Sequence, residues 1–481
     1  MKTRIVLLLL LAVCLSLGAQ EALQINGLNE AQFVYRTVED SLNTYFKDSF
    51  GFNLGYRNFR FGMKFISELP KYSNQSSELM SELDPNRLSV AWKELYAEYQ
   101  KDAFSIHAGT TQESFGQGIT FRSFQDIELD EDHRLDSFLL RYEDQLRFKA
   151  IYGALESESY PGRYDLAYGV DAEYPVLGGI RLGASTLAFR NLGAFSKYSF
   201  RDVFAGRLLV TQGNFDSYAE YAYSDQYRLQ GSSAIQGSAF YLNADYMLGN
   251  LLLGAAYKNY EDFGYRLQDI PLANYHGETL SDALASGLDE EGWQTRLMYN
   301  FNESLSFTAD YAEAWDEAKD KQMNDLFLAV DLYLDQDQYQ LSYSHIEKID
   351  EAVNTWQKEY YPAISAGFSL MATPVQVTAE FKEIVKQQNE TESSHYEPFV
   401  QADFTLHKLS LSLGLQSSWE DFSAWSDSRY MPNIELKYPI FSHSDLLVFA
   451  GKEAGGKVCR NGVCRYLAPF EGVRAELSTR F

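Results

Sequence analysis

The stretch YDLAYGVDAEY, residues 164–174, alternates strictly between apolar or aromatic side chains and small or polar ones. The same period of two recurs in DLFLAVDLYL at 325–334 and in KLSLSLGLQ at 408–416. Successive side chains of a β-strand point to opposite faces, so each stretch predicts a strand with one apolar and one polar face. The sequence therefore predicts an all-β protein.

The connections between the predicted strands alternate in length. Short connections fall at residues 57–58, 101–102, 143–144, 176–179, 213–216, 249–250, 300–304, 335–338, 371–374, 407–408 and 441–444. Longer polar segments lie among them, at 70–86, 111–134, 261–290 and 350–361. Short turns at one end and long loops at the other, joined by strands of about ten residues, are typical of an outer-membrane barrel.

We therefore predict a transmembrane antiparallel up-and-down β-barrel of roughly 24 strands, with a range of about 22 to 26, beginning near Ala31. An even strand number puts both termini on the periplasmic side of a Gram-negative outer membrane. A soluble two-sheet protein is the alternative fold, because it also has half-buried strands.

The N-terminus has the layout of a secretory signal peptide. A basic start at Lys2 and Arg4 precedes an apolar run and the small residues Gly18 and Ala19. We expect residues 1–19 to be cleaved, leaving a single barrel domain at 20–481. An uncleaved anchor is one alternative, and a lipoprotein modified at Cys14 is another.

The composition restricts the partners of the chain. Its formal net charge of −26 argues against nucleic acid, whose ligands carry basic patches. Its 34 Tyr and 32 Phe suit the aromatic belts of a membrane barrel, so the lipid bilayer is the expected partner.

The last residues, GVRAELSTRF, end on an aromatic residue where a free C-terminus is usually polar and frayed. We expect a lipid-facing row of Val473, Ala475, Leu477, Thr479 and Phe481. This ending resembles the C-terminal aromatic signal of bacterial outer-membrane barrels. The resemblance implies that Phe481 is an assembly signal read by the barrel-assembly machinery.

The stretch CRNGVC, residues 459–464, predicts a tight hairpin. Asn461 and Gly462 suit the positive-φ positions of a type I′ turn, which places Cys459 opposite Cys464. The close spacing of this non-hydrogen-bonded pair suits a cross-strand disulfide in an exported chain. A metal site would need more ligands than two thiols.

The most distinctive segment is AGTTQESFGQGITFRSFQDIELDEDHRLDSF, residues 108–138. Its two glycines indicate a turn where backbones approach closely. The segment resembles the E-x-F-G-x-G-[IL]-x-x-R-[ST]-[FY] signature of an uncharacterised family of exported barrel-like proteins from Bacteroidetes and related bacteria. The matching residues are Glu113, Phe115, Gly116, Gly118, Ile119, Arg122, Ser123 and Phe124. The family has no established activity, so the resemblance implies only a barrel-like fold and an exported location.

Charged residues of this segment suggest two further hypotheses. Glu113 and Arg122 flank the glycine turn and would form an ion pair in the lumen, or else be separately solvated. The acidic run from Glu128 to Asp132, followed by His133, invites a divalent-cation site, but the glycine and spacing of a calcium loop are missing. Such runs are usually solvated surface.

No residue is assigned a catalytic, cofactor-binding or metal-binding role. None of the seven His residues lies in a GxSxG or HExxH setting. An enzyme therefore ranks third among the functions we consider, below a transporting and a non-transporting barrel.

A barrel of this size needs something to narrow it. Strand spacing and tilt give a backbone diameter of about 45 to 50 Å. The candidates for inward folding are the segments 70–86, 111–134 and 261–290. Our leading hypothesis is a porin-like pore or transport protein for polar solutes, with acidic groups favouring cationic or neutral ones. The alternative is a non-transporting barrel that acts as a surface-binding or envelope-assembly scaffold, with an extracellular ligand or plugging partner still to be identified.

Overall fold

The structure is a computed structural model. It describes residues 23–37, 44–69, 89–126, 131–157, 162–191, 199–228, 235–280, 289–388, 390–420, 429–460, 463–467 and 469–481. The predicted signal peptide, residues 1–19, lies outside the described residues and stays a prediction.

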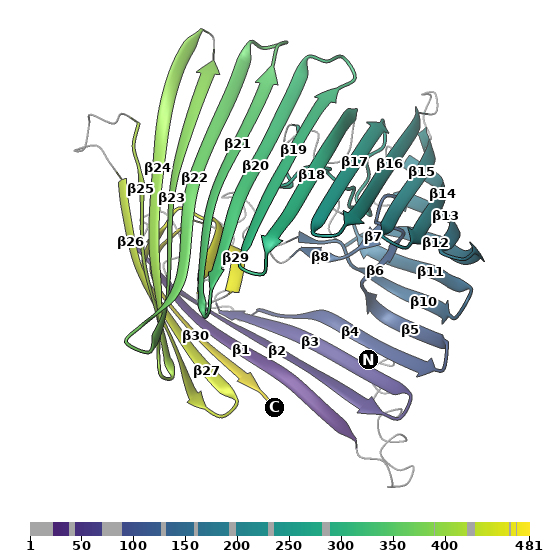
Figure 1. The fold of residues 1–481 in the computed structure, drawn as a ribbon. Helices are drawn as coiled ribbons and strands as arrows, with labels where there is room; N and C mark the ends of the chain where they lie inside the picture. Colours follow the sequence, from purple (N-terminus) through teal and green to yellow (C-terminus); the bar gives the residue numbers. More distant parts are fainter. Residues whose placement is uncertain are drawn as a thin grey trace.

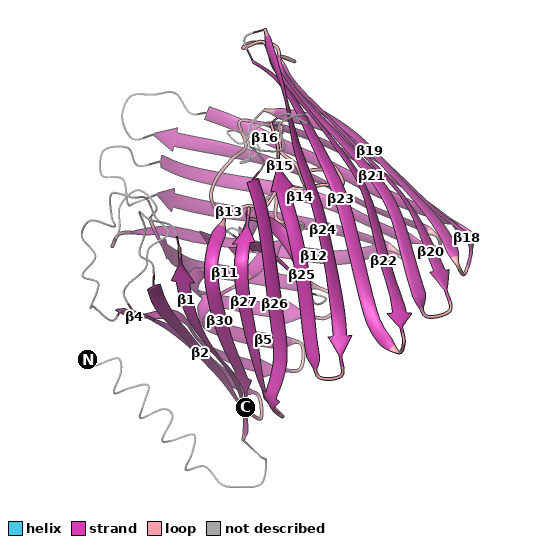
Figure 2. Cartoon of the chain, turned by 90° about the vertical axis from the view of Figure 1, so that its left-hand side faces the viewer, coloured by secondary structure: helices cyan, strands magenta, loops and turns pink. Residues whose placement is uncertain are grey.

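Twenty-four strands form one closed antiparallel sheet, which confirms the predicted fold class and strand count. Figure 1 shows them as a ring, and Figure 2 shows the same strands from the side. The strands of the barrel are β1 (Gln24–Arg36), β2 (Thr44–Tyr56), β3 (Phe59–Leu69), β4 (Ser89–Lys101), β5 (Phe104–Thr111), β10 (Leu135–Glu143), β11 (Arg147–Glu156), β12 (Tyr164–Leu177), β13 (Ile180–Asn191), β14 (Ser199–Gln212), β15 (Phe215–Arg228), β16 (Ile235–Leu248), β17 (Leu251–Glu261), β18 (Glu290–Asn302), β19 (Leu305–Asp316), β20 (Lys321–Leu334), β21 (Asp337–Asp350), β22 (Thr355–Leu370), β23 (Thr373–Gln388), β24 (Thr391–Leu406), β25 (Leu409–Ser418), β26 (Arg429–Phe441), β27 (Ser444–Glu453) and β30 (Phe470–Arg480).

The remaining strands are short and form separate two-stranded pairs. They are β6 (Glu113–Phe115) with β7 (Phe121–Ser123), β8 (Gln125–Asp126) with β9 (Glu131–Asp132), and β28 (Gly456–Arg460) with β29 (Val463–Leu467). In the described residues no helix is long and apolar enough to cross a bilayer.

The barrel closes between its first and last strands. Each long strand pairs with its neighbours along the chain, and Leu477 of β30 lies opposite both Leu446 of β27 and Ala31 of β1. The first strand begins at Gln24, earlier than the predicted Ala31. Short connections fall where the sequence predicts them, for example at 335–336 and 407–408.

One predicted loop is wrong. The segment 350–361 was expected to be a long polar loop, but β21 continues to Asp350 and β22 already begins at Thr355. The reason is that strand pairing continues past the apolar part of these strands, with Asp350 opposite Thr355 and Ile349 opposite Trp356. The polarity of residues 350–361 was therefore not enough to locate the ends of the loop.

The alternation of side chains gives this barrel an apolar outside. On β12, Val170 and Tyr174 are 40% and 51% exposed, whereas Ala167 and Asp171 are 0% and 5% exposed. The terminal row behaves in the same way, since Val473, Leu477 and Phe481 are exposed while Arg474 is buried. An exposed apolar outer face is the arrangement that a hydrocarbon environment requires.

The hairpin of β28 and β29 contains the two cysteines of the predicted disulfide, which stays a prediction. Its register places Cys459 opposite Cys464, as expected from the turn, while Asn461 and Gly462 lie outside the described residues and the side chains of the hairpin are not described. We expect the mature chain, refolded with an oxidant, to incorporate no iodoacetamide until it is reduced, and then two equivalents. Alkylation of both thiols before reduction would contradict the disulfide.

Candidate functional site

The segment that joins β5 to β10 folds into the barrel. Figure 1 shows β6, β7 and β8 within the ring, beside β10 to β12. Phe115, Ile119 and Phe121 of this segment are fully buried and form one hydrophobic cluster with wall residues such as Leu139 and Leu187. We call residues 113–124 the motif loop. The predicted inward folding of 111–134 is confirmed for its described residues.

A second inward loop, residues 262–280 between β17 and β18, packs against the motif loop. Its side chains Phe263, Leu267 and Ile270 belong to the same hydrophobic cluster. The two loops also share backbone hydrogen bonds, because the Arg122 amide donates to the Leu267 carbonyl at 2.8 Å and the Asp269 amide donates to the Gly118 carbonyl at 3.1 Å. The third candidate, 70–86, lies outside the described residues.

The two glycines of the motif allow the loop to approach its neighbours. Gly116 has a φ of 54° and Gly118 a φ of 95°, which favour glycine. A Cβ on Gly116 would lie 2.5 Å from Tyr218 Oη, and one on Gly118 would lie 2.9 Å from the Asp269 carbonyl oxygen. Close backbone approach at this turn is therefore confirmed.

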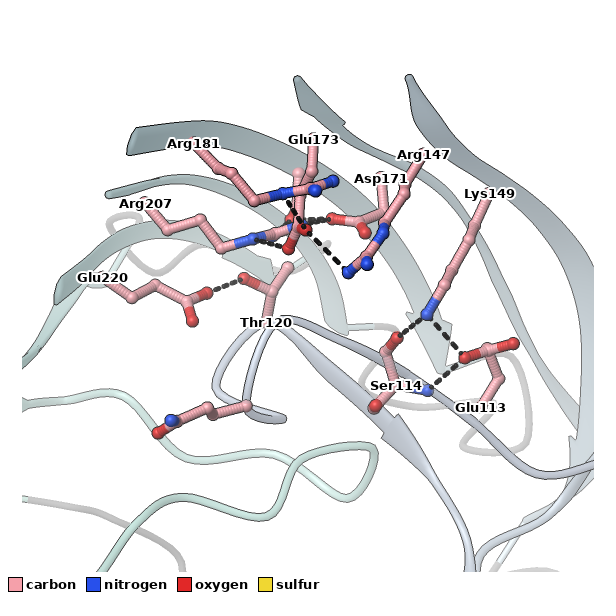
Figure 3. A network of polar contacts seen from close by, with 12 residues as sticks. Glu113, Ser114, Thr120, Arg147, Lys149, Asp171, Glu173, Arg181, Arg207 and Glu220 are labelled. Carbon is pink, nitrogen blue, oxygen red and sulfur yellow. Dashed lines mark hydrogen bonds and ion pairs between the residues drawn. The ribbon is translucent and has the colours of Figure 1, made fainter. Parts of the chain in front are cut away.

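Glu113 attaches the start of the motif loop to the barrel wall. Its carboxylate accepts from Arg141 Nε of β10 at 2.6 Å and from Lys149 Nζ of β11 at 2.9 Å. Lys149 also donates to the Ser114 carbonyl at 3.0 Å, and Figure 3 shows this contact. Burial alone would raise the pKa of the Glu113 carboxyl, but Lys149 and Arg141 outweigh it and hold that pKa below its ordinary value.

The predicted ion pair between Glu113 and Arg122 is wrong. In the register of β6 and β7, Arg122 lies opposite Ser114, the residue next to Glu113, so the two charged side chains point to opposite faces of the ribbon. Arg122 instead pairs with Asp269 of the second inward loop, and its guanidinium lies 4.8 Å from the centre of the Phe124 ring. The motif arginine thus joins the two loops.

The far side of the motif loop is attached to a buried polar cluster. Thr120 Oγ1 donates to Glu220 of β15 at 3.1 Å, and Tyr218 also donates to this carboxylate. Nearby, Arg207 of β14 contacts Asp171 at 2.6 Å and Glu173 at 2.9 Å, as Figure 3 shows. The motif loop is therefore attached to the wall at both ends.

The remaining motif residues complete this attachment. Ser123 Oγ donates to the Thr111 carbonyl at 2.7 Å and accepts from the Leu135 amide at 2.9 Å. This serine ties the end of the loop to both strands that flank the insertion, β5 and β10.

The acidic run gives no sign of a cation site in the part that the structure describes. Asp132 receives two hydrogen bonds of 2.8 Å from Arg134, which also lies 3.4 Å from Glu94. Glu128 and Asp130 lie outside the described residues, as does the side chain of Glu131. Among described residues no group of three or more His, Cys, Asp or Glu could hold a metal ion.

The lumen face of the wall beyond the loops carries charges of both signs. Strands β22 to β26 present carboxylates there, and the register places Asp403 opposite Ser412 and Ser412 opposite Glu435. The other carboxylates on this face are Glu359, Glu380 and Glu397. The cations on the same face are Lys382, Lys386, Arg429 and Lys437, and Lys382 pairs with Glu359 at 3.2 Å.

The architecture is that of a large outer-membrane-type barrel with loops fixed inside it. The chain belongs to the DUF6029 family, a family of unknown function, whose model matches residues 1–312. No curated protein sequence matches the chain at a significant level.

Solved structures share this fold at low sequence identity. The Escherichia coli P pilus tip assembly intermediate PapC-PapD-PapK-PapG matches with a TM-score of 0.56 and 12% identity, over 97% of this chain and 62% of that one. The P pilus usher PapC translocation pore matches with a TM-score of 0.49 and 11% identity, over 95% and 99%. The siderophore receptor PirA from Pseudomonas aeruginosa matches with a TM-score of 0.49 and 9% identity, over 96% and 81%. At such identities the likeness concerns the fold alone.

Proposed function

We propose that this chain is an outer-membrane pore for polar solutes, narrowed by the motif loop, with both termini in the periplasm. The apolar outer face and the predicted signal peptide support the location. The position of both termini at the end of the short turns supports the orientation, because barrels of this class have short periplasmic turns and longer extracellular loops.

The main support for a pore is that the inward loops are attached to one side of the barrel wall. Their contacts run from β10, at Arg141, to β21, at Lys348. A loop that partly buried ion pairs hold against one side of the wall narrows a wide lumen while it stays in place, and we interpret the motif loop in this way. A barrel with a backbone diameter of about 45 to 50 Å leaves room beside it.

The net charge of −26 and the lumenal carboxylates on β22 to β26 set the expected selectivity. Carboxylates that line a pore raise the local concentration of cations and repel anions. We therefore expect single-channel recordings of the refolded chain in planar bilayers to show stable cation-selective steps. Replacing Glu380 and Glu397 together by Gln lowers the cation-to-anion permeability ratio by about half or more, because two lumenal charges are removed.

A matched control is Glu303→Gln, in the exposed turn between β18 and β19, which is expected to keep the selectivity of the parent barrel. A folded, inserted barrel that conducts no ions would reject the pore. That outcome would favour the non-transporting scaffold, and the outer loops would then be tested for ligands.

A further inference from the structure

Three side chains from distant parts of the chain meet on the lumen side of β20 and β21. His276 of the second inward loop lies between Asp325 and Ser344, with Nδ1 2.7 Å from Asp325 Oδ1 and Nε2 3.0 Å from Ser344 Oγ. The register places Phe327 opposite Ser344 and Asp325 opposite Ile346, so both polar residues lie on one face. Asp325 lies 49 positions after His276 in the chain, and Ser344 lies 68 positions after it.

Several contacts fix the position of the imidazole ring. The His276 amide donates to the other carboxylate oxygen of Asp325 at 3.1 Å. The preceding Tyr275 stacks on Phe327 with 3.7 Å between ring centres and 7° between planes, and His276 packs edge-on against both rings. The Asp325 side chain is 0% exposed, while that of His276 is 22% exposed. The histidine side chain is thus partly exposed, while Ser344 is 8% exposed.

These two contacts of the imidazole ring determine which of its nitrogens carries the proton, and the resulting tautomer of His276 is the one that nucleophilic catalysis needs. A carboxylate oxygen accepts hydrogen bonds, so Nδ1 carries the proton that it shares with Asp325. In a neutral ring Nε2 then has a free electron pair, which faces the Ser344 hydroxyl and can take its proton. A Ser–His–Asp constellation is recognised by this geometry and by these roles, whatever the fold that carries it.

We propose that Ser344, His276 and Asp325 form a hydrolytic site for carboxylic esters inside the barrel. Ser344 Oγ attacks the ester carbonyl carbon while His276 Nε2 takes the hydroxyl proton. The bond to the alcohol oxygen breaks, the alcohol leaves with that proton, and the acyl group stays on Ser344. Water then adds to the acyl carbon with help from the same histidine, which releases the carboxylic acid and restores the serine.

Neighbouring cations point to an ester that carries negative charge. A cavity of about 310 Å³ lies beyond Ser344 on the loop side. Its charged lining residues are Lys321, Lys348, Lys386 and Asp350, and Asp350 pairs with Lys321 at 3.8 Å. Lys348 follows Ser344 by four residues on the same face, which is about 13 Å along the strand. Lys348 also pairs with Glu278 of the loop that carries His276, at 2.7 Å. An acyl ester with an anionic group at its other end fits this arrangement.

The first test is covalent labelling of the refolded full-length mature chain with diisopropyl fluorophosphate. The hydroxyl of Ser344 would attack phosphorus and release fluoride, adding one label that peptide mass spectrometry places on Ser344. We expect Ser344→Ala, His276→Gln and Asp325→Asn each to reduce labelling about 100-fold or more. Ser342→Ala is the matched control on the same face of β21 and is expected to label normally.

The second test uses two substrates, p-nitrophenyl butyrate and mono-p-nitrophenyl glutarate. We expect the anionic glutarate to be hydrolysed with the lower KM, and Lys386→Met to raise that KM without changing the KM for butyrate. Heat-dependent mobility in gels establishes that each variant is folded. A folded parent chain that is labelled at another serine, or not at all, would overturn the proposal and leave His276 as an anchor for its loop.

Discussion

Replacing Glu113 with Gln lowers the free energy of unfolding of the refolded barrel by about 3 kcal/mol, because it removes the charge of a mostly buried carboxylate that binds two partly buried cations. The Glu113 side chain is only 10% exposed and contacts both Arg141 and Lys149. Gln keeps the size and one acceptor but removes the charge. Urea titration followed by the fluorescence of the 6 Trp residues measures this change. Single-channel recording of the same variant is expected to show noisier steps, since the motif loop is released at one end.

Glu68→Gln is the matched control for this experiment. Glu68 also pairs with a lysine on the lumen side, but Lys47 lies 4.0 Å away and its side chain is 39% exposed. We expect a change of about 0.5 kcal/mol or less, as is usual for such pairs. Equal losses in the two variants would mean that Glu113 is an ordinary surface charge and does not hold the motif loop.

The pH dependence follows from the same contacts. The pKa of Glu113 is lower in the folded barrel than in the unfolded chain, so the carboxylate stabilises the fold fully above the unfolded pKa of about 4.3. This contribution is lost as the pH falls through the folded pKa. The parent barrel should therefore lose stability on acidification below about pH 4.3, and Glu113→Gln should lose less.

The fold could be predicted from the sequence because its determinants are local. A period of two identifies the strands, and short turns between them need residues that tolerate positive φ, such as Asp335 and His407. In a meander barrel each strand pairs with the next, so correct strands and turns already determine the topology. The prediction of a long loop at 350–361 was wrong because polar residues continue both strands beyond their apolar part.

The site could be predicted only in part, because its contacts join residues far apart in the chain. The motif located the inward loop, but the partners of Glu113 depend on which wall strands face it, and Lys149 is 36 residues away. Wall charges such as Arg207 look in the sequence like ordinary polar positions of a strand. One sequence signal was available for these wall charges. In GVDAEY, residues 169–174, charged residues occupy inward positions and small residues flank them.

The Ser344, His276 and Asp325 cluster could not be found from the sequence. His276 lies in a loop without periodicity, and no local motif surrounds Ser344. Only the register of β20 and β21, together with the inward fold of residues 262–280, brings the three together.

Deleting Phe481 shifts the closure equilibrium of the barrel toward the open chain by about 100-fold. The Phe481 amide donates to the Gly27 carbonyl at 3.1 Å, and the Gly27 amide donates to the Phe481 carbonyl at 2.8 Å. The ring stacks on Phe50 with centres 5.7 Å apart. Two backbone hydrogen bonds and one aromatic pair, at about 1 kcal/mol each, make about 3 kcal/mol, or a factor of about 100 in the closure equilibrium.

The variant Phe481→Ala separates the contribution of the ring from that of the backbone, and Gly27→Ala tests the whole contact between the two ends. Phe481→Ala keeps both hydrogen bonds and should lose less than the deletion. In Gly27→Ala the new Cβ would lie 2.4 Å from the Phe481 ring and 2.7 Å from the Gly51 carbonyl oxygen, so this variant disturbs both the ring and the pairing of β1 with β2. Heat-dependent gel mobility of refolded chains measures the closed fraction, and membrane fractionation of cells that express each variant measures assembly.

Phe441→Ala is the control for loss of an aromatic side chain at the same end of the barrel, where Phe441 is 71% exposed. We expect it to close and assemble like the parent. If the deletion refolds normally in detergent but fails to assemble in cells, Phe481 acts mainly through the assembly machinery. If it fails in both, the closing contacts with Gly27 and Phe50 are the cause. Normal behaviour in both would reject either role, because the seam would then close without its last residue.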